Sequence, residues 1–307
     1  ASRRITDLQQ IKMRRRGERR RGSHVFKLAS LVVSTFAVLS FGAAAADAQP
    51  FAPSRFSVDV RGEGPDVILI PGLGSSRDVW DAQVAALEGT HRLHLVQVAG
   101  FAGEAAPAST QSMIDPLVEE LAEYIESYTT GEPAIIGHSM GGLTGLILAR
   151  RHPERVSRVM IVDSLPFFSA MFGPQATAAG VEPQARMMRD QLIALDAASF
   201  AAQQQMGAGR LVKTESYRPT IIGWSVASDR TAFAQAMYEV MTTDMRAEVA
   251  NVQTPLTIVY AYDPAMGPEA MIDGLYRGGF GPAPNATFVR VDGSYHFIMI
   301  DQPEAFQ

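Results

Sequence analysis

The pattern of apolar and polar positions predicts strands and helices that alternate along the chain. Several short apolar runs are typical of strands buried on both faces, and the segments between them place apolar residues at helical spacing. Strands joined through helices form parallel β-α-β units. We therefore expect an α/β fold with a doubly wound, mostly parallel sheet. The predicted strands are 56–60, 67–70, 93–98, 134–136, 159–162, 256–260 and 286–291, and the predicted helices between them are 78–87, 113–128, 143–150 and 268–277.

One segment interrupts this alternation. The 90 residues between Asp163 and Thr254 contain no convincing buried strand, and helical patterns occur at 183–204, 217–227 and 231–241. A structureless loop of that length inside a compact domain is implausible. We expect a helical cap at 164–254, inserted between two late strands of a core formed by 49–163 and 255–307. Seven of the fourteen methionines lie there; flexible thioethers suit an adaptable apolar pocket wall, although simple packing against the core explains any single one equally well.

The charge distribution separates a leader from the body. Residues 1–27 hold ten basic and two acidic side chains, so the remainder carries a net charge of −13, which argues against a nucleic-acid partner. Basic residues, the uncharged stretch 28–46 and the small-x-small sequence 46–48 predict a secretory signal at 1–48. We expect export to the periplasm or outside, without stable membrane association after cleavage. The alternative is an uncleaved anchor, since 19 uncharged residues are about enough to span a bilayer. Met13 is an alternative start.

The sequence Gly137-His138-Ser139-Met140-Gly141 carries the main chemical signal. It fits G-x-S-x-G, a sharp strand-to-helix turn that exposes a nucleophilic serine, and it follows an apolar run and precedes a helix as that motif requires. Glycine is needed because a Cβ would not fit where strand and helix meet so closely. The alternative is a glycine-rich turn that contains a serine without catalytic function. The chain has no cysteine, which excludes disulfides and a thiol nucleophile.

Ser139 needs a base and an acid that orients it. Of six histidines, His296 alone lies in a loop after the last predicted strand, at the carboxyl end of the sheet and after the serine in chain order. Two aspartates follow predicted strands. Asp263 is the preferred acid because its strand immediately precedes the one that leads to His296, and Asp163 is the alternative.

An anionic intermediate at Ser139 also needs N–H donors. We expect these to be the backbone N–H groups of Met140, directly after the serine, and of Leu73, in the glycine-rich loop after the strand 67–70. His138, Phe167 and Met171 are candidate substrate-binding residues. No metal and no cofactor are implied.

Four stretches together resemble the α/β-hydrolase superfamily, specifically its capped serine hydrolases of the esterase type. The resemblance implies hydrolysis of a carboxylic ester, a small molecule with an apolar acyl group, through an acyl-enzyme intermediate. Alternatives are a lactonase, amidase, perhydrolase or carbon–carbon hydrolase with the same triad, or a ligand-binding protein without catalysis. Pro71 stands where many members have histidine, and the chain ends at the start of the expected last helix. The stretches are Pro71-Gly72-Leu73-Gly74, Gly137 to Gly142, His152-Pro153-Glu154-Arg155-Val156, and His296-Phe297 with Gln302-Pro303-Glu304-Ala305-Phe306.

Overall fold

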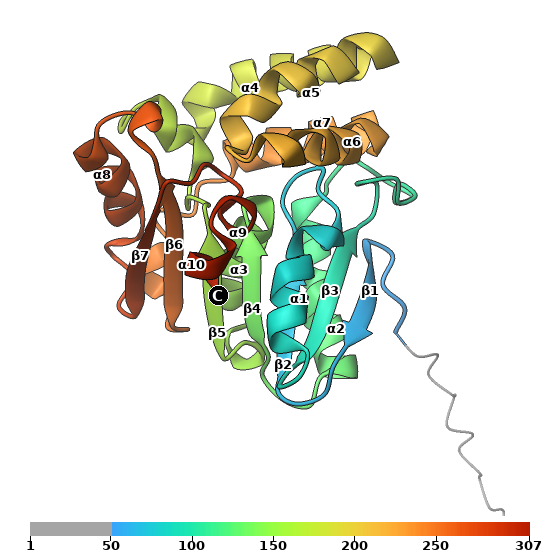
Figure 1. The fold of residues 1–307 in the computed structure, drawn as a ribbon, viewed down its shortest axis with the longest axis vertical. Helices are drawn as coiled ribbons and strands as arrows, with labels where there is room; N and C mark the ends of the chain where they lie inside the picture. The colour runs from blue at the N-terminus through green and yellow to red at the C-terminus, as the bar shows by residue number, and fades with distance from the viewer. Residues whose placement is uncertain (1–50) are drawn as a thin grey trace, which may run out of the picture. The chain divides into compact units, whose positions relative to one another are not determined.

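The computed structural model describes residues 51–307, and the predicted signal at 1–48 lies outside the described residues. Seven strands form one sheet in the order β1-β3-β2-β4-β5-β6-β7. β1 pairs with β3 in antiparallel fashion, and all other neighbours are parallel, as Figure 1 shows. This confirms the predicted fold class. The strands are β1 (Phe56–Arg61), β2 (Asp66–Ile70), β3 (Arg92–Val98), β4 (Ala134–His138), β5 (Arg158–Val162), β6 (Leu256–Tyr262) and β7 (Ala286–Asp292).

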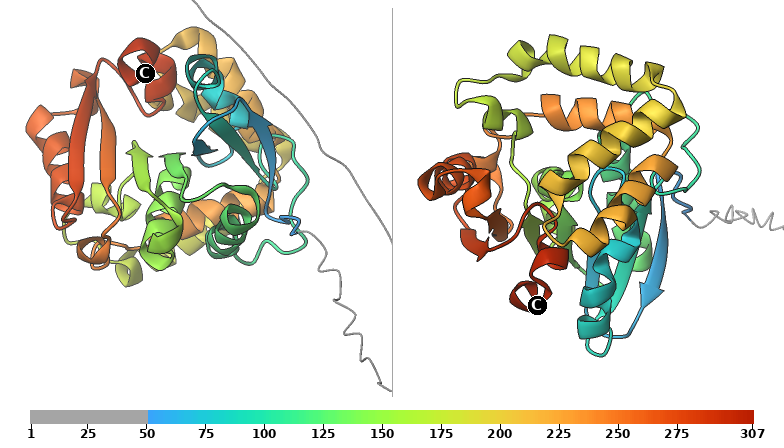
Figure 2. Two further views of the ribbon diagram at one scale, coloured as in Figure 1. Left: turned by 90° about the horizontal axis from the view of Figure 1, so that it is seen from below. Right: turned by 45° about the horizontal axis from the view of Figure 1, so that its top comes forward.

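Helices cover both faces of this sheet, which the view from below in Figure 2 shows most clearly. None of the helices in residues 51–307 combines the length and hydrophobicity that crossing a membrane requires. The helices outside the segment 164–254 are α1 (Asp81–Leu87), α2 (Ile114–Tyr128), α3 (Met140–Arg151), α8 (Glu269–Phe280), α9 (Ile298–Asp301) and α10 (Pro303–Phe306).

The side chains of β2 pack into two apolar layers, one on each face of the sheet. Its five residues are all buried, and successive side chains point to opposite faces. Ile68 and Ile70 pack in the cluster that includes α2, α3 and α8, whereas Val67 and Leu69 pack in the cluster that includes α1 and α9. Complete burial of one such side chain contributes about 1.5–3 kcal/mol. A continuous apolar run is therefore what a strand between two helical layers requires.

The segment 164–254, which we call the helical insertion, contains no strand and lies across the upper end of the sheet in Figure 1. The structure has two helices where the pattern at 183–204 suggested one. Leu195 leaves the helical conformation, and the Asp196 side chain accepts a hydrogen bond from the Ser199 N–H and so caps a new helix. The helices are α4 (Ala178–Ala194), α5 (Ala197–Leu211), α6 (Arg218–Ala227) and α7 (Arg230–Thr242).

The helix α7 packs against loops that follow the carboxyl ends of β2 and β3. A Cβ on Gly74 would lie 2.6 Å from the Phe233 ring, and one on Gly100 would lie 2.7 Å from Ala232 Cβ. The Glu239 carboxylate also accepts the first free N–H groups of α2, at 2.7 Å from Ile114 N. The helical insertion therefore lies at the edge of the sheet where ligands bind in open α/β folds.

Candidate active site

Ser139 occupies the sharp turn between β4 and α3. Its backbone has φ 53° and ψ −119°, a left-handed conformation that costs a non-glycine residue energy. The glycines on either side make the turn possible. A Cβ on Gly137 would collide with the Gly141 carbonyl, and a Cβ on Gly141 would collide with the Ile70 carbonyl. The structure thus contains the strand–turn–helix context that the G-x-S-x-G motif predicts.

The strand pairing brings Asp163 beside this turn. His138 pairs with Val162 in the parallel β4–β5 ladder, so Ser139 and Asp163 are each the first residue beyond a paired position. Asp163 also has a positive φ, of 45°. The Ser139 N–H donates to the Val162 carbonyl oxygen at 2.9 Å, which fixes one turn against the other.

His296 contacts Asp163. The imidazole Nδ1 lies 2.7 Å from Asp163 Oδ2. The other carboxylate oxygen, Oδ1, accepts hydrogen bonds from the Ala261 N–H at 2.9 Å and the Tyr276 hydroxyl at 2.8 Å. Burial and the neighbouring Asp163 raise the pKa of Tyr276 well above its usual value, so its hydroxyl stays a donor. The Asp163 carboxylate only accepts hydrogen bonds, so the Nδ1 of His296 that contacts it carries the hydrogen. Nε2 is therefore left as the basic nitrogen.

Asp263, the preferred acid from the sequence, does not contact His296. Its Oδ2 lies 2.7 Å from Lys213 Nζ, and its Oδ1 accepts the Ala265 N–H at 2.9 Å. The hydrogen bond from Lys213 lowers the pKa of Asp263. The sequence favoured Asp263 as the partner of the histidine, and this is wrong. The carboxylate that contacts His296 is that of Asp163. Both oxygens of Asp263 are engaged by Lys213 and Ala265, whereas Asp163 lies beside the serine turn with one oxygen on His296.

The loop after β2 approaches the serine from the other side. A Cβ on Gly72 would lie 3.1 Å from Ser139 Cβ and 2.9 Å from His138 Nδ1. Neither the Leu73 nor the Met140 N–H takes part in a turn or loop hydrogen bond within residues 51–307. Met140 is the first residue of α3, where a helix leaves its N–H groups unsatisfied. The Leu73 N–H therefore lies in the loop after β2, which approaches Ser139, and the Met140 N–H lies at the start of α3, directly after Ser139.

His138 supports the histidine loop rather than lining a pocket. It is 1% exposed, and its Nε2 lies 3.0 Å from the His296 carbonyl oxygen. Burial, followed by the neighbouring His296, holds the pKa of His138 well below its usual value, so the ring is neutral. His138 is not among the residues that line the cavity described next, so its place at a substrate pocket stays a prediction from the sequence.

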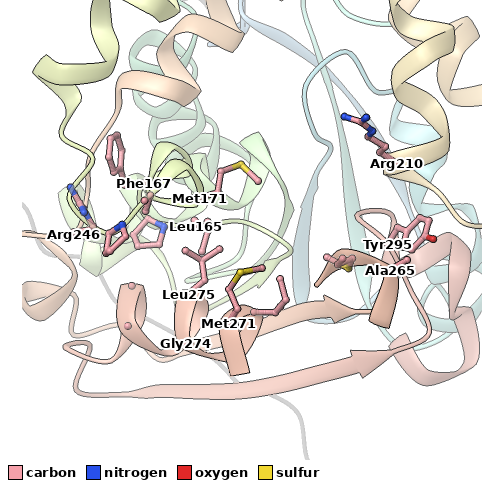
Figure 3. Close-up of a pocket in the computed structure, with 18 of the residues that line it drawn as sticks. Leu165, Phe167, Met171, Arg210, Arg246, Ala265, Met271, Gly274, Leu275 and Tyr295 are labelled. Carbon is pink, nitrogen blue, oxygen red and sulfur yellow. The ribbon is translucent and has the colours of Figure 1, made fainter. Parts of the chain in front are cut away.

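A cavity of about 900 Å³ adjoins this arrangement, between the helical insertion and α8. Its lining includes Phe167 and Met171, two predicted substrate-binding residues, on and beside the short helix η3 (Phe168–Phe172). Figure 3 shows Met271 and Leu275 of α8 on the same side. The lining also includes Leu165 and Tyr295, close in sequence to Asp163 and His296, although it includes neither Ser139 nor His296 themselves.

Comparison with known proteins agrees with this geometry. Residues 67–306 match the model of the alpha/beta hydrolase family. The chain belongs to that family. It is 26% identical over 257 residues to a pimeloyl-[acyl-carrier protein] methyl ester esterase of Aeromonas hydrophila, covering 81% of this chain and 95% of the relative. It is 31% identical over 253 residues to the esterase of the same name from Vibrio vulnificus, covering 80% and 92%.

Solved structures show the same fold. The enol-lactonase of Burkholderia xenovorans superimposes with a TM-score of 0.67 at 21% identity, over 82% of this chain and 93% of that one. The chain described here is thus an alpha/beta hydrolase by family model and by fold, and the relatives from Aeromonas hydrophila and Vibrio vulnificus are both named esterases. Within residues 51–307, no group of three His, Cys, Asp or Glu side chains is arranged to hold a metal ion.

Sequence reasoning missed the residues that hold the His296 loop of this hydrolase. The Asp301 carboxylate accepts the Thr214 N–H at 2.8 Å, the Lys213 N–H at 3.0 Å and the Tyr295 N–H at 2.9 Å. Tyr276, which donates to Asp163, was missed as well. Apart from the Tyr295–Asp301 hydrogen bond, these contacts join residues from distant segments. No spacing or motif marks them, so a single sequence offers no signal for them.

Proposed function

We propose that this enzyme hydrolyses carboxylic esters through an acyl-enzyme intermediate on Ser139. The observation that supports this most directly is the 2.7 Å contact between His296 Nδ1 and Asp163 Oδ2 beside the serine turn. With Nδ1 bound to the carboxylate, His296 offers Nε2 as the general base. Ser139, His296 and Asp163 are therefore the proposed triad.

Each residue of the triad has one role in the proposed reaction. The Ser139 Oγ attacks the ester carbonyl carbon while His296 Nε2 takes the hydroxyl proton, and Asp163 stabilises the imidazolium that forms. The carbonyl oxygen becomes an oxyanion, which the Leu73 and Met140 N–H groups bind. The C–O bond to the alcohol then breaks, and His296 returns the proton to the leaving oxygen.

Water completes the cycle by the same steps. It attacks the acyl carbon and gives a proton to His296. The bond from the acyl carbon to Ser139 Oγ then breaks, His296 returns the proton to Oγ, and the carboxylic acid is released. One oxyanion donor contributes roughly 2.7–4 kcal/mol to transition-state stabilisation in enzymes of this kind. This is why the position of the loop after β2 matters for turnover.

The comparisons suggest which esters to test first. The relatives at 26% and 31% identity are both named for hydrolysis of a methyl ester. The mainly apolar lining of the adjoining cavity favours an apolar acyl group. Methyl and p-nitrophenyl esters of straight-chain acids are therefore the proposed model substrates. Export of the enzyme stays a prediction from the leader sequence.

A panel of p-nitrophenyl esters of increasing chain length tests the proposal. Wild-type enzyme is expected to release p-nitrophenol, and Ser139→Ala is expected to lose turnover while keeping its circular dichroism spectrum. A fluorophosphonate should label the wild-type chain and leave Ser139→Ala unlabelled. Equal turnover in the two chains, or no labelling of the wild type, would remove Ser139 as the nucleophile. Lactones and amides in the same panel distinguish an enzyme with another acyl substrate.

A further inference from the structure

The cavity beside the triad has an unusual charge pattern. Its lining contains two arginines, Arg210 and Arg246, and no other charged side chain. Most of the remaining lining is apolar, with leucine, isoleucine, methionine and phenylalanine side chains. This local excess of positive charge occurs in a body, residues 28–307, that carries a net charge of −13. Whether this cavity attracts anionic ligands depends on which of the two guanidinium groups is left without a carboxylate partner.

Arg246 already has its partners. Its guanidinium lies 2.6 Å from the Asp244 carboxylate, donates to the Ala176 carbonyl at 2.8 Å, and lies over the Phe167 ring at 4.5 Å from its centroid. Its charge is therefore neutralised. Arg246 fixes one wall of the cavity and does not provide a free cation.

Arg210 differs because it lacks a carboxylate partner. It lies in the last turn of α5 and is exposed. The cations near it in sequence are paired, Lys213 with Asp263 at 2.7 Å and Arg218 with Glu215 at 3.1 Å. Within residues 51–307, Arg210 forms no ion pair, and it is the one cation of the lining left without one.

The two kinds of lining lie at different ends of the cavity. Figure 3 shows Arg210, Tyr295 and Ala265 on one side and Phe167, Met171 and Leu275 on the other. Tyr295 immediately precedes His296, and Leu165 lies two residues after Asp163. Sequence neighbours of two triad residues therefore lie at the two ends of the cavity, Tyr295 at the end with Arg210 and Leu165 at the apolar end.

We propose that Arg210 makes the enzyme prefer esters that carry a carboxylate in addition to the ester group, such as half-esters of straight-chain dicarboxylic acids. This inference rests on the proposed ester hydrolysis. A single unpaired guanidinium matches a single negative charge, and its planar fork binds a carboxylate through two parallel hydrogen bonds. The apolar end accommodates the methylene chain, which gains from leaving water.

A matched pair of substrates tests this preference. One is the monomethyl ester of a straight-chain dicarboxylic acid, and the other is the methyl ester of the monocarboxylic acid with the same number of chain carbons. Wild-type enzyme is expected to favour the charged ester in kcat/KM by roughly tenfold, the effect of one charge-assisted hydrogen bond. The preference should fall with added salt, because the site is exposed and salt screens its charge.

Variants at Arg210 assign the preference to that side chain. Arg210→Gln should bring the ratio of the two kcat/KM values to about one, and Arg210→Glu should invert it. Arg186→Gln is the matched control, since Arg186 is an exposed arginine of the helical insertion that pairs with Glu182 and does not line the cavity. The same loss in Arg186→Gln would indicate a general surface-charge effect and would overturn the inference.

A binding measurement separates this inference from the proposed function. Calorimetry with the dicarboxylic half-ester on Ser139→Ala should give a Kd about tenfold lower than on the Ser139→Ala, Arg210→Gln double variant. Equal Kd values, together with equal turnover of both esters by the wild type, would overturn the role of Arg210 and leave ester hydrolysis standing. Tight, Arg210-dependent binding without turnover of any ester would instead remove the proposed function and keep the carboxylate site.

Discussion

Lys213 Nζ lies 2.7 Å from Asp263 Oδ2, and this ion pair joins the helical insertion to the loop after β6. Asp263 also accepts the Ala265 N–H, so both of its oxygens are engaged away from His296. The carboxylate that chain order favours as the catalytic acid is thus a contact between the insertion and the core. The two aspartates can be told apart by experiment.

Replacing each aspartate by asparagine should give very different enzymes. Asp163→Asn keeps the size of the side chain but favours the wrong tautomer of His296, and we expect kcat to fall by about 10⁴-fold. Asp263→Asn loses an ion pair with a half-exposed lysine, and we expect kcat to change by less than about tenfold. Steady-state kinetics on a p-nitrophenyl ester measures both. A larger loss of kcat in Asp263→Asn than in Asp163→Asn would reverse the assignment.

The spacing between Gly72 and Ser139 predicts a sensitive position in the loop after β2. An alanine Cβ at Gly72 would lie 2.9 Å from His138 Nδ1 and 3.1 Å from Ser139 Cβ, so the loop or the serine must move. Because small displacements of reacting groups are costly, we expect Gly72→Ala to lower kcat by roughly a hundredfold. Gly89→Ala is the control, since its Cβ would meet no atom within 4 Å. Equal activity of the two variants would show that the loop position does not matter.

Asp301 should affect turnover without touching substrate. Its carboxylate accepts N–H groups from Lys213 and Thr214 of the helical insertion and from Tyr295, next to His296. We expect Asp301→Ala to destabilise the fold by about 1–3 kcal/mol and to reduce kcat more than it changes KM, because His296 loses its fixed position.

The rate of fluorophosphonate labelling of Ser139 checks this directly and should fall in parallel with kcat. Asp190→Asn is a suitable control, because Asp190 is exposed on α4 and pairs only with its neighbour Arg189. If Asp301→Ala lowers stability but labels at the wild-type rate, Asp301 is a structural residue alone.

A buried network at the opposite edge of the sheet should govern acid stability. Burial by itself raises the pKa of Asp66, but hydrogen bonds from Arg92, His94 and Thr130 outweigh it and hold that pKa well below its ordinary value of 3.8. A carboxylate with a lowered pKa stabilises the fold above the unfolded-state value, and this contribution is lost as the pH falls below it. His94 acts at higher pH, because burial lowers its pKa below 6.5 and protonation then disfavours the fold.

Urea unfolding at a series of pH values tests this network. In the wild type, the free energy of unfolding should fall as the pH drops below about 6.5 through His94, and again below about pH 4 through Asp66. Asp66→Asn should be less stable at pH 7 and should lose most of the second decrease. An unchanged slope below pH 4 in Asp66→Asn would assign the acid sensitivity to other carboxylates.

Local signals explain what the sequence could predict. The five-residue motif at 137–141 predicts the serine turn, because its glycines are needed where a Cβ would collide. The position of His296 after the last strand predicts it as the base. The acid does not follow from such signals, because Asp163 and Asp263 both end apolar strands. What distinguishes them is that Asp263 pairs with Lys213 of the helical insertion whereas Asp163 contacts His296, and neither long-range contact is written in any local pattern. The contacts of Asp301 with Lys213 and Thr214 are similarly non-local.

The hydrogen bond from the Phe297 N–H to the Leu211 carbonyl, at 3.1 Å, has a consequence for engineering this enzyme. It ties the end of α5 to the residue after His296. Exchanging the whole insertion for that of a relative would therefore also replace a backbone partner of the histidine loop. A chimera that keeps residues 211–214 and exchanges the rest should retain the geometry of the base, whereas one cut at 164 and 254 would alter specificity and turnover together.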